Sequence, residues 1–222
     1  MRQAPLSPPG REDGLALLRR RLLPVDRALD WGGLAEQAPI GVLLPAAVLV
    51  PLLPNAEARH SPDLPTSLDL LFAIRAAHLA RHPGQIGFPG GRREAPDRDP
   101  VATALRETEE EMGIARAAVE VLGCLPALDS RSGYRIWPVV GLLPAGQTLH
   151  PDPGEVERCF TLPLGHCLDL LGAALPAAAL AADAAPVDSL WAPRIPLGEG
   201  LLWGVTSAIL CALYRCLREP GA

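Results

Sequence analysis

The sequence predicts an α+β protein built on a mixed β-sheet. Short apolar, β-branched runs typical of buried strands recur along the chain, and only a few helical patterns separate them. The two kinds of element do not alternate strictly, as a fully parallel sheet would require. The 222 residues are 49% hydrophobic and 20% charged, which is enough apolar material for the core of one domain and too little charge for a disordered chain.

The N-terminal part differs from the remainder of the chain. Residues 1–38 are polar and rich in Pro and Arg, and we expect residues 1–45 to form an N-terminal extension with a short helix over 14–23. The apolar run 46–53 then predicts a buried strand, in which Pro51 favours an edge position or a bulge because proline cannot donate a ladder hydrogen bond.

Three segments follow this strand. Residues 68–74 are either a second strand or a buried helical turn, because the apolar pattern fits both. The segment 81–91 is rich in Gly and Pro and predicts a loop with tight, positive-φ positions. A helix is expected over 100–112, with Asp99 as its N-cap and Gly113 as the left-handed residue after its end.

The C-terminal half contains further elements of both kinds. Strands are expected at 119–125 and 134–143, and 154–162 leads into a stretch rich in Leu and Ala. The low-complexity run 171–186 predicts a helix or a loop, and 202–217 predicts a closing amphipathic helix.

Composition excludes several classes of protein. All 20 basic residues are Arg, and against 25 acidic residues they give a net charge of −5, which argues against nucleic acid as a partner. The longest apolar run, 39–54, contains four prolines and is unsuited to a membrane helix. We therefore expect a soluble, cytoplasmic protein without a nucleic-acid or membrane partner. The cysteines are odd in number and scattered, so we expect small buried hydrophobes rather than a disulfide scaffold: Cys124, Cys159, Cys167, Cys211 and Cys216.

The helix predicted at 100–112 has two unlike faces. At 100° per residue, four residues form a stripe that we expect to be buried: Val101, Leu105, Thr108 and Met112. Glu107, Glu110 and Glu111 fall on the side away from that stripe. Like charges at this spacing repel one another by roughly 0.2–0.5 kcal/mol per pair. One interpretation is a solvated acidic face, and the other is a site for Mg²⁺ or Mn²⁺, which favour clustered carboxylate oxygens.

The segment GGRREAPDRDPVATALRETEEEMGI, residues 90–114, resembles the Nudix box of hydrolases that act on nucleoside diphosphates linked to another moiety. Three departures stand out. The stretch from Gly91 to Arg106 is one residue longer than the general box, Asp97 lies near the position of its first Glu, and Thr108 occupies a slot that is usually aliphatic.

Flanking segments resemble the coenzyme A diphosphatase branch of this family, which carries the longer box. These segments are HPGQIGFPGG at 82–91, LPALDSRSGYRIWPVVGLLP at 125–144 and WGVTSAIL at 203–210. The resemblance implies a Nudix hydrolase domain over 46–218 with the box at about 91–114. It also implies a mixed sheet sandwiched between α-helices, an α/β/α arrangement.

The resemblance also implies roles in catalysis. Glu107 and Glu111 would ligate the divalent metal, and Glu110 would be a further ligand or would orient the others. Arg106 is expected to brace the glutamates more than to contact substrate. Glu155, in the later PDPGEVERCF segment, is a candidate base or additional metal ligand.

Five residues are implied in substrate binding: Arg75, His82, Gln85, Gly90 and Gly91. Glycines in such a loop allow the backbone to approach phosphates closely, although a tight turn alone would also explain them. His82 could equally brace the loop. We expect Arg75 to recognise the 3′-phosphate of coenzyme A, with Arg81 as the alternative.

The implied reaction is metal-dependent hydrolysis of coenzyme A, or its thioesters, to 4′-phosphopantetheine and adenosine 3′,5′-bisphosphate. The first alternative is a Nudix hydrolase of ADP-ribose or a dinucleotide, because the box does not discriminate between substrates. The second is a Nudix-fold binding module without catalysis, against which the presence of all three carboxylates argues.

Overall fold

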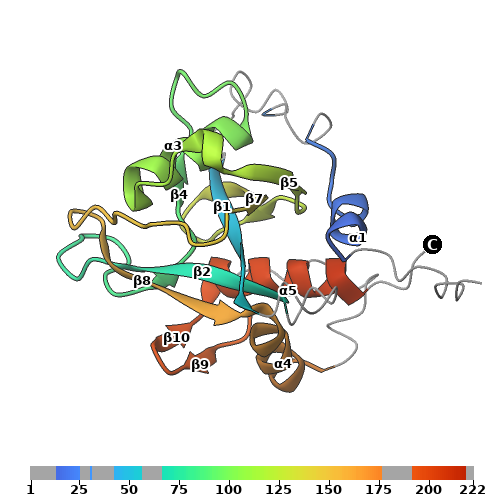
Figure 1. Cartoon of the computed structure of the whole chain (residues 1–222). Helices are drawn as coiled ribbons and strands as arrows, with labels where there is room; N and C mark the ends of the chain where they lie inside the picture. Colours follow the sequence, from blue (N-terminus) through green and yellow to red (C-terminus); the bar gives the residue numbers. More distant parts are fainter. Residues whose placement is uncertain (1–13, 26–30, 32–42, 57–66, 177–191, 219–222) are drawn as a thin grey trace, which may run out of the picture.

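The computed structural model describes residues 14–25, 31, 43–56, 67–176 and 192–218. Within these ranges, an eight-stranded mixed sheet and a two-stranded hairpin are combined with four α-helices. Helix α3 (Pro100–Met112) covers one face of the sheet, and α4 (Leu164–Ala174) and α5 (Gly204–Arg218) cover the other (Figure 1). The predicted α+β class and α/β/α layering are confirmed.

Strand β1 (Leu44–Pro54) is the centre of the sheet. It runs parallel to β7 (Tyr134–Leu142) on one side, and on the other side it is antiparallel to β2 (Leu68–Arg75) and to β4 (Gly90–Arg92). The other strands are β3 (Ile86–Gly87), β5 (Glu120–Cys124), β6 (Leu128–Asp129), β8 (Val156–Pro163), β9 (Ile195–Leu197) and β10 (Gly200–Leu202).

The structure corrects some expectations and decides others. Pro51 is not on an edge strand, because β1 has neighbours on both sides. It lies between the part of β1 that pairs with β4 and the part that pairs with β2, where the ladder requires no N–H. Residues 68–74 are a strand. The segment 81–91 is not wholly loop, since it contains β3 and the first two residues of β4.

Alternation along β1 divides the core into two layers. Ala47 and Leu49 belong to the apolar cluster beneath α3, whereas Val50 and Leu52 belong to the cluster shared with α4 and α5. This is the period of two expected for a strand buried on both faces.

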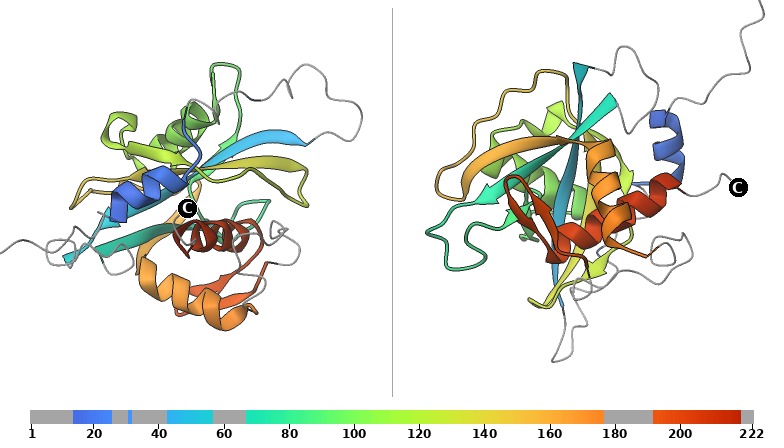
Figure 2. Two further views of the ribbon diagram at one scale, coloured as in Figure 1. Left: turned by 90° about the vertical axis from the view of Figure 1, so that its right-hand side faces the viewer. Right: turned by 90° about the horizontal axis from the view of Figure 1, so that it is seen from below.

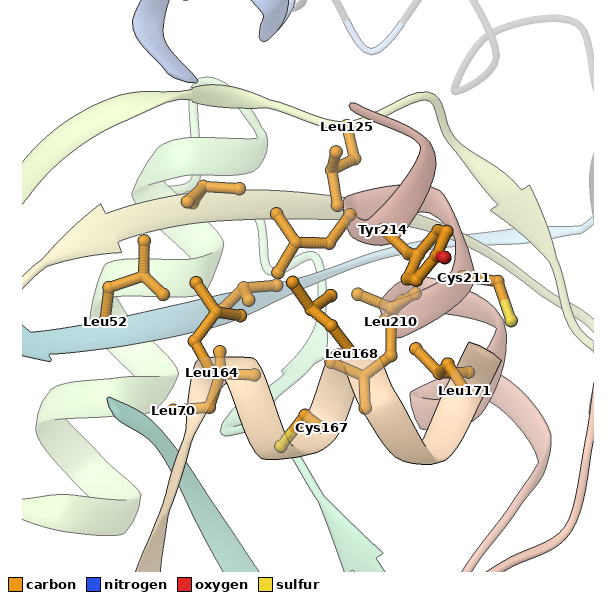
Figure 3. Packing of buried hydrophobic residues seen from close by; sticks show 14 of the residues in the cluster. Leu52, Leu70, Leu125, Leu164, Cys167, Leu168, Leu171, Leu210, Cys211 and Tyr214 are labelled. Carbon is orange, nitrogen blue, oxygen red and sulfur yellow. The ribbon is translucent and has the colours of Figure 1, made fainter. Parts of the chain in front are cut away.

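The cluster on the α5 side is the larger of the two. Leu164, Cys167, Leu168 and Leu171 of α4 pack against the side of α5 that carries Leu210 (Figure 3). Two further views show that α4, α5 and the β9–β10 hairpin lie together on the face opposite α3 (Figure 2).

The N-terminal helix α1 (Gly14–Arg21) also contributes to this cluster. Leu18 and Leu22 are fully or almost fully buried in it. Leu23 and Cys124 of β5 exchange backbone hydrogen bonds of 2.8 and 3.0 Å. Leu18 and Leu22, which the sequence analysis placed in an N-terminal extension, therefore belong to the main core.

Helix α3 begins and ends where the sequence predicts. The carboxylate of Asp99 accepts a 2.7 Å hydrogen bond from the N–H of Ala102, and Gly113 ends the helix with φ 67°. These are the expected N-cap and left-handed C-terminal residue.

The predicted facing of α3 is wrong in part. Thr108 and Met112 are buried, but Val101 and Leu105 are only half-buried at the margin of the cluster, and fully buried Ala104 lies nearer the centre of the contact. Because the contact is made by small residues, α3 packs with Glu111 turned into the protein, where it is 4% exposed. Glu111 was expected outside the buried stripe.

Burial raises the pKa of Cys124, Cys159 and Cys211 to about 11 and that of Cys167 to about 12, and none of these four thiols forms a disulfide in the described part of the chain. They are therefore poor nucleophiles at neutral pH. No helix in the described part of the chain has the length and apolarity needed to cross a membrane.

Docking of α1 is tested at Gly123, which has φ 153° and lies against that helix. A Cβ at this position would fall 2.6 Å from Cβ of Leu22, so Gly123→Ala combines backbone strain with a steric clash. We expect a loss of about 2–4 kcal/mol in the free energy of unfolding, measured in urea. The matched control is Gly146→Ala, where φ is 73° and no heavy atom lies within 4 Å of the new Cβ; we expect about 1–2 kcal/mol there. Equal losses in the two variants would contradict the docking.

Candidate active site

A cavity of about 300 Å³ lies where β1 and β4 meet the first turns of α5. It is lined by all five residues that the sequence analysis assigned to substrate binding: Arg75, His82, Gln85, Gly90 and Gly91. The structure therefore brings together residues from β2, from the loop after it and from β4. Arg81, Arg92 and Tyr134 also line the cavity, and sequence reasoning had not placed Arg92 or Tyr134 among the binding residues.

The connection between β2 and β3 folds back tightly on the end of β2. The N–H of Gly84 donates to the carbonyl of Arg75 at 3.0 Å, and the N–H of Gln85 donates to that of His82 at 3.2 Å. His82 has φ 55°, a left-handed conformation that is uncommon for a residue other than glycine. Such conformations are concentrated at functional sites, and here the strained residue lines the cavity.

Gly90 and Gly91 allow α3 to approach β4 closely. The N–H of Gly90 donates to Oε2 of Glu111 at 3.0 Å. A Cβ at Gly90 would lie 2.4 Å from the carbonyl oxygen of Ala47, and one at Gly91 would lie 2.3 Å from Oε1 of Glu107. Glycine at position 91 thus leaves room for Glu107 directly behind the strand that lines the cavity, and glycine at position 90 allows β4 to lie close to β1.

Arg106 is buried within the group of acidic residues. Its guanidinium lies 3.0 Å from Asp97, 2.9 Å from Glu107 and 2.8 Å from Glu110. It also donates to the carbonyl of Arg92 at 3.0 Å. These contacts are those of a bracing residue, which is the role that the sequence analysis favoured for Arg106.

Asp97 is a site residue that sequence reasoning noted only as a departure from the box. Its carboxylate accepts hydrogen bonds from Arg106, from the hydroxyl of Thr103 at 2.8 Å and from the N–H of Glu94 at 2.9 Å. Burial acts to raise the pKa of Asp97, but these donors outweigh it and hold the pKa below 3.8. The sequence signal that could have identified Asp97 as a site residue was its position near the first glutamate of the box.

The three glutamates of α3 have different environments. Burial raises the pKa of Glu111 to about 8; the charges of Glu107 and Glu155 add to the rise, and the Gly90 N–H and Arg75 oppose it. Burial also raises the pKa of Glu107, although Arg106 counteracts this. The Glu110 side chain is 55% exposed and directed at Arg106. Glu107 and Glu111 thus form the buried pair, and Glu110 lies outside it.

Glu155 is placed near this pair by its loop. The N–H groups of His150 and Asp152 donate to the carbonyls of Met112 and Glu111, at 2.9 and 3.0 Å. The carbonyl of Glu155 accepts from the N–H of Ala76, directly after Arg75. The loop therefore joins the end of α3 to the end of β2, and the charge of Glu155 raises the pKa of both Glu107 and Glu111.

The donor chemistry of this site fits a hard divalent cation. Among the described residues, no three His, Cys, Asp or Glu side chains converge into a complete ligand set. Mg²⁺ commonly keeps several waters and is held by one or two carboxylates together with substrate phosphates. Glu107 and Glu111 supply two such carboxylates, and a bound cation would offset the burial of their charges, which is the main cause of their raised pKa values.

The chain is similar in sequence to known proteins. The family model described as NUDIX domain matches residues 47–180. An "Uncharacterized Nudix hydrolase NudL" of Photorhabdus laumondii is 38% identical over 170 residues, which cover 77% of this chain and 83% of that protein. Its namesake in Pectobacterium atrosepticum is 44% identical over 125 residues, and this chain spans 60% of that relative's length.

Solved structures are more distant. A MutT/nudix family protein from Enterococcus faecalis is 17% identical with a TM-score of 0.45, and the match covers 94% of this chain and 75% of that one. A C. elegans Ap4A hydrolase is 18% identical with a TM-score of 0.43, over 56% of this chain and 83% of the other.

Substitution of Glu111 tests the electrostatic cost of the buried pair. Because its pKa is raised in the folded state, the folded protein binds the extra proton, and wild-type stability falls as the pH rises from about 4.5 to about 8. In chelator, we therefore expect Glu111→Gln to be more stable than wild type at pH 8 by on the order of 2–4 kcal/mol. The two proteins should become similar near pH 4.5, as measured by urea unfolding. A variant less stable than wild type at pH 8 would contradict the argument.

Substitution of Gly91 tests the position of Glu107. The residue has no positive φ, and the atoms that a Cβ would meet are the movable end of the Glu107 side chain. We expect Gly91→Ala to fold with stability within about 1 kcal/mol of wild type but to bind Mn²⁺ ~10–100-fold more weakly. Gly198→Ala, where no heavy atom lies within 4 Å of the new Cβ, is the control and should keep wild-type affinity. Wild-type Mn²⁺ affinity in Gly91→Ala would show that Glu107 does not take part in metal binding.

Proposed function

The chain belongs to the Nudix family of hydrolases, and on this premise we propose that it hydrolyses the diphosphate bond of coenzyme A or its thioesters. The products would be 4′-phosphopantetheine and adenosine 3′,5′-bisphosphate. In this reaction water adds its oxygen to one phosphorus, the bond from that phosphorus to the bridging oxygen breaks, and a proton is released.

One observation carries the proposal. A cavity lined by Arg75, Arg81 and His82 also has the backbone of Gly90 and Gly91 in its wall, with Glu107 and Glu111 directly behind. Cationic side chains and an approachable backbone suit a substrate with several phosphate groups. The carboxylates of Glu107 and Glu111, behind the same wall, suit a divalent cation of the kind that binds together with substrate phosphates.

Glu107 and Glu111 are the residues that would hold Mg²⁺ or Mn²⁺. When bound, the cation would neutralise diphosphate charge and lower the pKa of a coordinated water. Arg106 keeps Glu107 in place, and the N–H of Gly90 orients Glu111. Glu155 is our candidate for the group that accepts the proton of the attacking water, because its charge acts on both glutamates.

The two cationic residues from the β2–β3 region would have separate tasks. Arg75 lies 3.7 Å from Oε1 of Glu111, which favours contact with the diphosphate beside the metal. Arg81 is exposed and donates to the hydroxyl of Tyr134 at 3.4 Å, in another part of the same cavity. We therefore assign recognition of the 3′-phosphate to Arg81, the alternative in the sequence analysis, in place of Arg75.

The substrate is tested by comparing coenzyme A, dephospho-coenzyme A, ADP-ribose and a dinucleotide, with product identification by mass spectrometry. A charge-assisted hydrogen bond to the 3′-phosphate would raise kcat/KM for coenzyme A over dephospho-coenzyme A by ~10–100-fold. Arg81→Ala should remove most of this preference and leave hydrolysis of the dephospho compound nearly unchanged. Arg75→Ala should lower kcat/KM for both compounds.

Arg116→Ala is the control, because this exposed arginine pairs with Glu109 outside the cavity, and it should retain the preference. Equal rates on the two compounds in wild type would eliminate 3′-phosphate recognition. A preference for ADP-ribose or a dinucleotide would favour the alternative Nudix activity, and absence of hydrolysis with every compound would favour a binding module.

A further inference from the structure

Trp31 is buried against the loop that leads into α3, although it belongs to the N-terminal segment. Its side chain is 4% exposed and joins the apolar cluster that contains Ala104 and Met112 of α3. It precedes the region 47–180 that the family model matches. A residue from outside the matched region thus packs on the helix that carries the glutamates.

The indole makes one polar contact with this loop. Its N–H donates to the carbonyl oxygen of Asp97 at 3.3 Å, within the buried interior. The carboxylate of the same Asp97 holds Arg106, and Arg106 in turn lies 2.9 Å from Glu107. The indole is therefore attached to the main chain of the residue that fixes Arg106.

Other hydrogen bonds of this loop act elsewhere. At its start, the N–H of Arg93 donates to the carbonyl of Pro45 on β1 at 3.0 Å. The N–H of Asp97 donates to the carbonyl of Glu94, and the N–H of Glu94 donates to the carboxylate of Asp97, so these two bonds close the loop on itself. The indole connects the loop to the sheet at Asp97, because its ring packs on a strand.

The ring of Trp31 is held on two sides. It meets Trp137 of β7 edge-on, with centroids 5.3 Å apart and planes at 83°. The guanidinium of Arg93 lies 5.3 Å from its centroid. Nε of Arg93 is buried and has no hydrogen-bond partner among the described residues, so the aromatic face is the group that compensates it. Trp31 is thus wedged between the sheet and the loop.

We infer that Trp31 is a positioning residue for the metal-binding glutamates, acting through Asp97 and Arg106. The inference rests on the proposed metal-dependent function of the site. Trp31 does not line the cavity in the described structure, so its effect should fall on metal binding and turnover and spare substrate affinity.

The test is Trp31→Phe in the full chain, which keeps an aromatic ring under Arg93 and removes the donor to Asp97. We expect Mn²⁺, titrated by the electron paramagnetic resonance signal of the free ion without substrate, to bind ~3–10-fold more weakly. We expect kcat for coenzyme A to fall by a similar factor, with KM unchanged. Trp31→Ala, if it folds, should show a larger loss of Mn²⁺ affinity.

Leu171→Ala separates positioning from general stability. Leu171 is fully buried in the cluster on the other side of the sheet, so this variant should lose thermal stability and keep wild-type Mn²⁺ affinity. Wild-type Mn²⁺ affinity in Trp31→Phe overturns the inference, and so does an equal loss of affinity in Leu171→Ala. Failure of the wild type itself to bind Mn²⁺ would instead overturn the proposed function.

Discussion

The buried ion pair between Asp97 and Arg106 determines the geometry of the site. Arg106 would be costly to bury alone, and Asp97 makes its burial possible with a carboxylate that is itself fully hydrogen-bonded. The same guanidinium contacts Glu107 and Glu110 of α3, so one cation compensates two carboxylates on the helix and that of Asp97 in the loop before it. Arg106 also donates to the carbonyl of Arg92, so the same side chain links α3 to β4.

The second constraint is the absence of side chains at Gly90 and Gly91. At Gly91 it leaves Glu107 in contact with the strand that lines the cavity, and at Gly90 it allows that strand to lie close to β1. The arrangement is unfavourable for the metal-free protein, because burial raises the pKa of both glutamates. The buried carboxylates thus lower the stability of the folded protein, and groups with strongly shifted pKa values are concentrated at functional sites.

Much of this architecture could be predicted because local chemistry specifies it. Asp99, Pro100 and Gly113 determine where α3 begins and ends, and the structure agrees to the residue. Its facing could not be predicted from apolar spacing, because Ala104 and Thr108 are small and allow Glu111 to turn inward.

The five residues that short motifs predict to bind substrate meet in one cavity. The contributions of Tyr134 and Trp31 depend on contacts between distant segments, as does the position of Pro51 in a central strand. Such contacts leave no periodic signal in the sequence.

The central place of β1 also affects how the chain is made. Its parallel partner β7 follows roughly 80 residues later, which is about 4–16 s of synthesis at typical rates. During that interval β1 is an apolar strand without its longest partner, of the kind that pairs with other chains. Pro51 interrupts its donors in mid-strand, and a proline at such a position reduces aggregation of nascent protein before the sheet is complete.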